Sequence, residues 1–72
     1  MNFGQALEAL KEGKKVQREG WNGKGMWIEL QVPDVNSKMQ RPYIYIEPGE
    51  GWRVPWVASQ PDMLSDDWVV VL

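Results

Sequence analysis

The first apolar positions recur every three or four residues, which places them on one face of an α-helix. Asn2 precedes this run as an N-cap, and Gln5 follows it at the spacing of a capping box. Gly13 stands where a left-handed C-terminal cap belongs. We therefore predict a helix over residues 2–12, which is too short to be stable unless its apolar stripe packs on a sheet. The stripe consists of Phe3, Ala6, Leu7 and Leu10.

Further along the chain, apolar and polar positions alternate, which is typical of half-buried strands. Pro55 favours a sheet edge or a bulge for its strand, because proline cannot donate to a hydrogen-bond ladder. Residues 33–41 are expected to form a flexible loop, and residues 59–64 a loop with one helical turn. The fold class is α+β: an N-terminal helix packed on a small antiparallel sheet of four to five strands, in a single compact domain. The predicted strands cover residues 16–18, 26–32, 43–47, 52–58 and 68–72.

The last predicted strand is apolar at every position of residues 68–72, so both of its faces should be covered. One helix covers only one face of a small sheet. Trp27, Tyr43 and Tyr45 have the opposite parity to the isoleucines of their strands and would place aromatic rings on the other face. Such a face is an interface or a pocket wall. We therefore predict a homo-oligomer.

The composition of the 72-residue chain excludes much chemistry. It contains five tryptophans but no cysteine and no histidine, which excludes zinc fingers, thiol nucleophiles, Ser-His-Asp triads and disulfides. A domain of this size buries too little surface for a large core. The tryptophans must therefore serve dense packing, oligomerisation or a ligand site.

The charge pattern argues against a polymeric partner. Eight basic and ten acidic residues give a net charge of -2, without the basic stripe that nucleic-acid binding requires. Residues 1–24 carry +2 and residues 25–72 carry -4. A small anionic ligand near the N-terminal third is one interpretation, and a cationic helix end is the other. Since no apolar run reaches membrane-spanning length and no signal peptide is present, an intracellular protein is expected.

The densest motif is residues 20–25, with three glycines in six residues. Asn22-Gly23 is a strong turn signal, so a tight hairpin is one interpretation. The other is a binding loop, in which Trp21 offers a stacking face, Asn22 an amide and Lys24 a cation. The segment is not a P-loop, because Gly25 follows Lys24 where that motif requires Ser or Thr.

A second cluster runs from Trp56 to Trp68. Ser59 and Asp62 have the spacing of a capped helical turn. Asp66 and Asp67 should point to opposite faces, so they are not expected to form a catalytic pair. One is expected to act as a cap or pair with Arg18 or Arg53, the other to stay in solvent. No calcium loop is present, so no metal or other cofactor is expected.

These two clusters carry a resemblance to a known family. Residues 1–16 followed by 20–27 resemble the start of the phage Thoeris anti-defence family of the second type, and residues 56–60, 62–64 and 66–68 are similar to its C-terminal motif. The resemblance covers nearly the whole chain and is weakest over residues 33–53.

The resemblance implies a nucleotide sponge and not an enzyme. Proteins of this family sequester a cyclic ADP-ribose isomer (glycocyclic ADP-ribose) in the cytoplasm of the infected bacterial host and so block Thoeris defence. They form homotetramers with pockets between subunits, and some also bind cyclic dinucleotides at separate sites. Two alternatives stay open: an enzyme with Asp66 or Asp67 as base, and a protein-interaction module that docks through its Trp/Tyr face. By resemblance, the ligand-binding residues are Trp21, Asn22, Lys24, Trp27, Ser59, Gln60 and Asp67.

Overall fold

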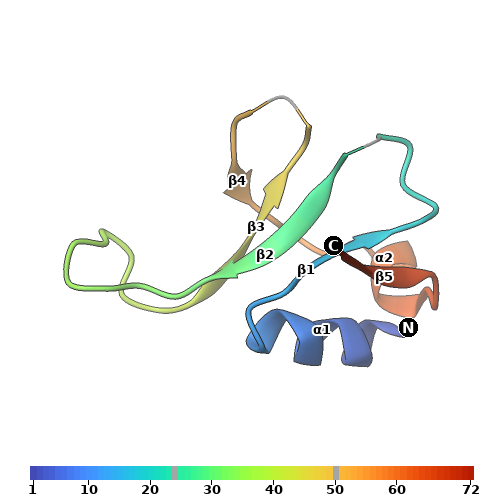
Figure 1. Ribbon diagram of the computed structural model, residues 1–72, viewed down its shortest axis with the longest axis horizontal. Helices are drawn as coiled ribbons and strands as arrows, with labels where there is room; N and C mark the ends of the chain where they lie inside the picture. Colours follow the sequence, from blue (N-terminus) through green and yellow to red (C-terminus); the bar gives the residue numbers. More distant parts are fainter. Residues whose placement is uncertain (24, 50) are drawn as a thin grey trace.

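The computed structural model describes residues 1–23, 25–49 and 51–72, which form two helices and a five-stranded sheet (Figure 1). The strands are all antiparallel and lie in the order β4-β3-β2-β1-β5. This arrangement confirms the predicted α+β class. In chain order the elements are α1 (Phe3–Lys11), β1 (Lys15–Arg18), β2 (Trp27–Gln31), β3 (Tyr43–Glu47), β4 (Val54–Pro55), α2 (Gln60–Leu64) and β5 (Trp68–Val71).

The N-terminal helix begins and ends where the sequence predicts. The Asn2 side chain accepts a hydrogen bond from the Gln5 backbone N–H at 2.8 Å, and the Gln5 side chain accepts from Asn2 N–H at 2.9 Å. Together these bonds complete the capping box. Gly13 has a φ of 86°, the left-handed conformation of a C-terminal cap.

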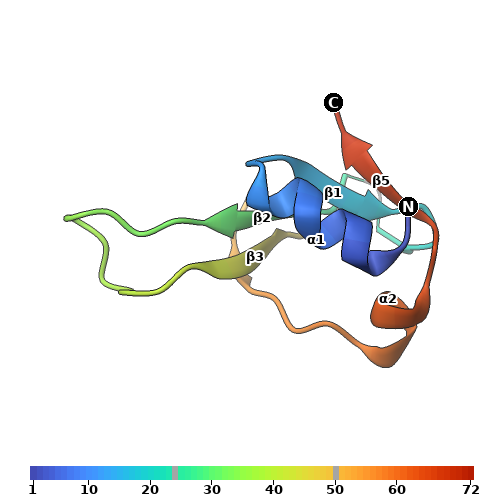
Figure 2. The same cartoon turned by 90° about the horizontal axis from the view of Figure 1, so that it is seen from below.

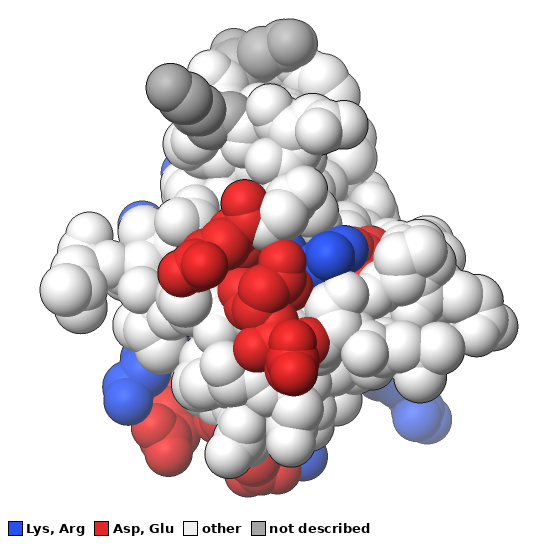
Figure 3. All heavy atoms as spheres, turned by 90° about the vertical axis from the view of Figure 1, so that its right-hand side faces the viewer, with Lys and Arg blue, Asp and Glu red and all other residues white. Residues whose placement is uncertain are grey.

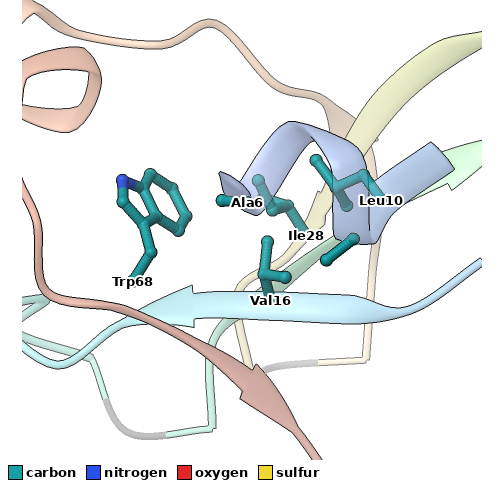
Figure 4. Close-up of a cluster of buried hydrophobic side chains, with 6 residues drawn as sticks. Ala6, Leu10, Val16, Ile28 and Trp68 are labelled. Carbon is teal, nitrogen blue, oxygen red and sulfur yellow. The ribbon is translucent and has the colours of Figure 1, made fainter. Parts of the chain in front are cut away.

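One face of α1 packs on the sheet and forms the core (Figures 2 and 4). Ala6 and Leu10 of the helix meet Val16 of β1, Ile28 of β2 and Trp68 of β5, all of them buried. Phe3 and Leu7, the other predicted stripe positions, pack against this cluster and are partly buried. The indole of Trp68 is fully enclosed, and its Nε1 donates to the Asp62 carbonyl at 3.0 Å, so the largest core side chain leaves no unpaired donor.

The two edges of the sheet differ. β4 is an edge strand and contains Pro55, as predicted. It is shorter than the predicted strand 52–58: after the Trp56 N–H donates to Ile44 O at 2.9 Å, the chain leaves the sheet, and Val57 is 87% exposed. β5 forms the other edge and pairs with β1 from Lys15↔Val71 to Arg18↔Trp68.

Both helices lie on the side of the sheet to which Val16, Ile28 and Trp68 point. Alternate residues point the other way, and we call this second side the outer face. The outer face comprises Lys15, Gln17, Trp27, Glu29, Gln31, Tyr43, Tyr45, Glu47, Val69 and Val71.

Neither helix in the described ranges is long and apolar enough to cross a membrane.

Candidate functional site

The two sequence motifs meet at one partly buried arginine. Arg18, at the end of β1, donates from Nη1 to Asp62 Oδ1 at 2.9 Å and from Nε to Asp67 Oδ1 at 2.8 Å. Trp21 Nε1 donates to the same Asp62 oxygen at 3.0 Å, and Gly20 N–H donates to Asp67 Oδ2 at 2.8 Å. We call these five residues the Arg18 cluster. It joins the glycine-rich segment to α2 and to the segment that follows α2.

Opposite charges and low exposure shift the pKa values of the ionisable side chains in this cluster. The side chains of Arg18 and Asp62 are only 16% and 11% exposed. Burial opposes ionisation of Asp62, but hydrogen bonds from Trp21, Arg18 and Ser59 outweigh it and lower the pKa of Asp62 to about 2. The hydrogen bond from Arg18 lowers the pKa of Asp67, and the bonds to Asp67 and Asp62 raise the pKa of Arg18. The cluster therefore remains ionised across the physiological range.

The side chains of Asp67 and Arg18 approach Gly20 so closely that they leave no room for a Cβ atom. A Cβ built at this position would lie 2.8 Å from Asp67 Oδ2 and 3.3 Å from Arg18 Nη2. Any larger residue would push the carboxylate away from the Gly20 N–H that it accepts from. The glycine thus fixes where the loop leaves β1.

Trp21 packs against other indoles. Its ring meets Trp68 edge-on at a centroid distance of 5.3 Å and Trp56 at 6.4 Å. The ring is half-buried, and its one donor is engaged by Asp62. Trp21 is therefore part of the aromatic packing around Trp68, and its role in stacking a base stays a prediction.

The remaining predicted site residues lie around this cluster. Asn22 is exposed in the loop, and Lys24 lies outside the described residues. Ser59 is the N-cap of α2: its hydroxyl accepts from Asp62 N–H at 3.2 Å, and its own N–H donates to Asp62 Oδ2 at 3.1 Å. Gln60 begins α2 and is exposed. The structure thus links Trp21 and Ser59 directly to Asp62, and Asp67 to Asp62 through Arg18, and these role assignments remain predictions.

The prediction that one of Asp66 and Asp67 pairs with an arginine, while the other stays in solvent, is confirmed. Asp67 pairs with Arg18, while Asp66 is exposed. Within the described ranges, no group of three or more acidic residues could hold a metal ion. Acidic side chains gather beside a basic one on the side of the molecule that carries α2 (Figure 3), so this surface by itself is unfavourable for a phosphate.

Trp27 lies apart from the Arg18 cluster, on the outer face. Lys15 Nζ is 4.3 Å from the centroid of the Trp27 ring, and the Arg53 guanidinium is 5.4 Å from it. Tyr45 meets Trp27 edge-on at 6.0 Å and donates its hydroxyl proton to Glu29. Burial and this bond raise the pKa of Tyr45 to about 12, so it remains a donor.

Two surface depressions adjoin Trp21 and Trp27, the tryptophans predicted to bind ligand. One, of about 450 Å³, has Trp27 and Lys15 in its wall and is completed by Gly13, Lys14, Glu29, Val70, Val71 and Leu72. We call it the Trp27 depression. The other, of about 310 Å³, is lined by Gln17, Arg18, Glu19, Trp21, Gly23 and Gly25. The first combines an indole with cations, whereas the second combines an indole with a paired arginine and a glutamate.

Sequence reasoning placed Arg18 and Asp62 only as a possible ion-pair partner and a capping residue. The Ser59–Asp62 spacing already explained Asp62, so nothing local indicated that its second oxygen also accepts from Arg18 and Trp21. Lys15 was not selected, Tyr45 was placed only on the aromatic face, and Arg53 was considered only as a partner of Asp66 or Asp67. Their contacts with Trp27 or Glu29 depend on strand order, which the spacing of residues along the chain does not encode.

The chain is similar to known proteins over nearly all of its length. Residues 1–71 match the family model described as Tad2-like, the Thoeris anti-defense 2-like domain. The chain is also 37% identical to "Thoeris anti-defense 2" of Bacillus phage SP01, over 84 aligned positions that cover 99% of this chain and 94% of that relative. Because the alignment is longer than the chain itself, the relative carries residues that this chain lacks.

Proposed function

The chain belongs to the Thoeris anti-defence 2-like family, and we propose that it counters Thoeris by holding a cyclic ADP-ribose-type signal nucleotide without degrading it. The nucleotide of the proposal is glycocyclic ADP-ribose, held in the cytoplasm of the infected bacterium. The observation that carries the proposal is that Gly20 and Trp21 of the first motif donate to Asp67 and Asp62 of the second, with Arg18 between these two carboxylates.

The distribution of the candidate residues favours a site between subunits. Trp21 and Asp67 belong to the Arg18 cluster on the helix side, whereas Trp27 lies on the outer face. A ligand that lies on one face contacts only one of these sets within one chain. The depressions of about 310 and 450 Å³ are surface features, and a ligand pocket must enclose most of its ligand. We therefore propose a homo-oligomer, a tetramer, in which a second copy closes the site.

Displacement of a cationic side chain from the Trp27 ring offers a way to bind phosphate at the Trp27 depression. Lys15 and Arg53 lie against the Trp27 ring in the free chain. An adenine that stacks on this indole displaces a cation from the ring face, and the released ammonium can pair with the pyrophosphate. On this proposal Lys24 and the backbone amides of the glycine-rich segment supply further phosphate contacts.

The residue types suit retention of an intact ligand. The chain has no cysteine or histidine, and two carboxylates of the C-terminal motif, Asp62 and Asp67, accept hydrogen bonds from Arg18. A carboxylate with a lowered pKa is a poor general base at neutral pH. We therefore propose binding without turnover.

The test is recovery of the intact signal. Purified protein is incubated with glycocyclic ADP-ribose and filtered, and the retained fraction is heat-denatured and analysed by mass spectrometry. Stoichiometric depletion with release of unchanged nucleotide supports the proposal. No depletion refutes it, and a linear product formed below stoichiometry would identify an enzyme instead. A parallel titration with cyclic dinucleotides tests for a second ligand class.

The outer face supports one alternative, a protein-interaction module. Trp27, Tyr43 and Tyr45 lie on neighbouring strands with the same orientation, and such surfaces dock proteins. The variant Trp27→Ala separates the two ideas. If the wild type captures a host protein that this variant loses, while both bind the nucleotide equally, the interaction module is favoured.

A further inference from the structure

Asn22 and Gly23 form a site at which the chain can change its own covalent structure. The pair lies in the segment between β1 and β2, and both residues are exposed. We propose that Asn22 deamidates spontaneously through a succinimide formed with the Gly23 nitrogen, and that this modification adds a negative charge to the candidate ligand loop. The site follows from the residues themselves. Only its effect on binding rests on the proposed function.

The reaction is an intramolecular acyl transfer followed by hydrolysis. The deprotonated Gly23 nitrogen attacks Asn22 Cγ, the Cγ–Nδ2 bond breaks, and Nδ2 takes up a proton and leaves as ammonia. The resulting five-membered imide is opened by water at either carbonyl. Opening at Cγ gives aspartate, opening at the main-chain carbon gives isoaspartate, and nothing is oxidised or reduced.

Gly23 satisfies the main requirement of this attack. Glycine has no Cβ to shield its nitrogen or to restrict the backbone angles that ring closure needs. Within the described part of the chain, the Gly23 N–H donates no hydrogen bond, so no bond to a described residue has to break first. A Cβ here would also lie 2.2 Å from Met26 Sδ, so a side chain at position 23 would displace the Met26 side chain.

The other two asparagines provide matched internal controls. Asn36 is also exposed, but its neighbour has a side chain, and the Ser37 N–H donates to Asp34 O at 3.1 Å. Asn2 is the helix N-cap, and its side-chain oxygen accepts from Gln5 N–H at 2.8 Å. At Asn36 the attacking nitrogen is thus already bonded, and at Asn2 the side-chain amide is held by the helix, so both arrangements oppose succinimide formation. We expect the reaction to select Asn22.

The modification would alter the electrostatics of the loop. The Asn22 amide is neutral, and its product is a carboxylate three residues from the exposed Glu19. A new negative charge beside a pyrophosphate is unfavourable. The proposal therefore predicts weaker nucleotide binding after modification, and slower modification while a bound nucleotide contacts Asn22.

The experiment follows all three asparagines in the intact protein. The chain is held at 37 °C and pH 8, and samples are digested and mapped by mass spectrometry for the gain of about 1 Da that replaces the amide by an acid. We expect Asn22 to convert about tenfold faster than Asn36, which is a barrier difference of about 1.4 kcal/mol. Conversion at Asn22 no faster than at Asn36 overturns the proposal.

A second arm separates this proposal from the proposed function. The variant Asn22→Gln keeps an amide but needs a slower six-membered ring closure, so its position 22 should stay unmodified. Saturating glycocyclic ADP-ribose should slow conversion at Asn22 and leave Asn36 unchanged. Fast conversion that the nucleotide does not slow supports the modification site but refutes the contact between Asn22 and ligand.

Discussion

At the scale of single residues, Asp66 and Asp67 show how adjacent carboxylates acquire different roles. Asp67 accepts from Arg18 Nε at 2.8 Å and from Gly20 N–H at 2.8 Å, whereas Asp66 is exposed. We predict that Asp67→Asn lowers the melting temperature, because Arg18 loses a charged partner. The matched variant Asp66→Asn should melt as the wild type does. Thermal unfolding of both variants checks this, and equal effects would contradict it.

The pKa of Asp62 predicts how stability depends on pH. This pKa is about 2 in the folded chain and about 3.9 in an unfolded one. The folded state therefore binds this proton more weakly, so the contribution is present above about pH 4 and is lost as pH falls toward 2. The expected loss is about 2 kcal/mol, and Asp67 acts in the same direction.

Urea unfolding between pH 6 and pH 2 measures this loss. The variant Asp62→Asn should be less stable at pH 6 and should show a shallower decline on acidification. A decline as steep as that of the wild type would assign the effect to other carboxylates.

At the scale of elements, α2 depends on its cap. A helix of five residues is not stable by itself, and the Ser59 hydroxyl and the Asp62 carboxylate bind each other's backbone N–H. We predict that Ser59→Ala costs about 1 kcal/mol. Ser59→Thr keeps the hydroxyl and should recover most of that loss. Unfolding free energies of the two variants test this, and an equal loss in both would contradict a capping role.

The elements also show what the sequence could predict. The capping boxes at Asn2 and Ser59 and the cap at Gly13 depend on neighbours within four residues, so their spacing revealed them. The sequence did not reveal where β4 ends, because Val57 has a strand-forming side chain but lies outside the sheet. The Arg18 cluster joins residues more than 40 positions apart, and no local pattern encodes such a contact. The candidate site residues therefore rest on the glycine-rich motif and the resemblance, whereas their connections came from the fold.

At the scale of the whole molecule, the outer face predicts association. Val69 and Val71 lie on this face of the edge strand β5 and are partly exposed. We predict that the wild type has a solution mass several times that of one 8.3 kDa chain. Val71→Lys should shift it toward the single-chain mass, because a buried ammonium opposes the contact.

Light scattering after size-exclusion chromatography measures both masses. The control is Val57→Lys, which makes the same exchange at an 87% exposed position outside the sheet and should leave the mass unchanged. A wild type of single-chain mass would refute the oligomer and, with it, a site closed by a second copy.

The packing of the indoles has an optical consequence. The rings of Trp21, Trp56 and Trp68 meet edge-on, with centroids 5.3 to 6.4 Å apart. Indole rings this close, and inclined to one another by 61° to 84°, couple their in-plane transition dipoles, which produces a pair of circular-dichroism bands of opposite sign beside the backbone signal. The far-ultraviolet spectrum of this protein therefore underreports or distorts its helix content, while the exciton pair itself reports whether the three rings keep their native arrangement.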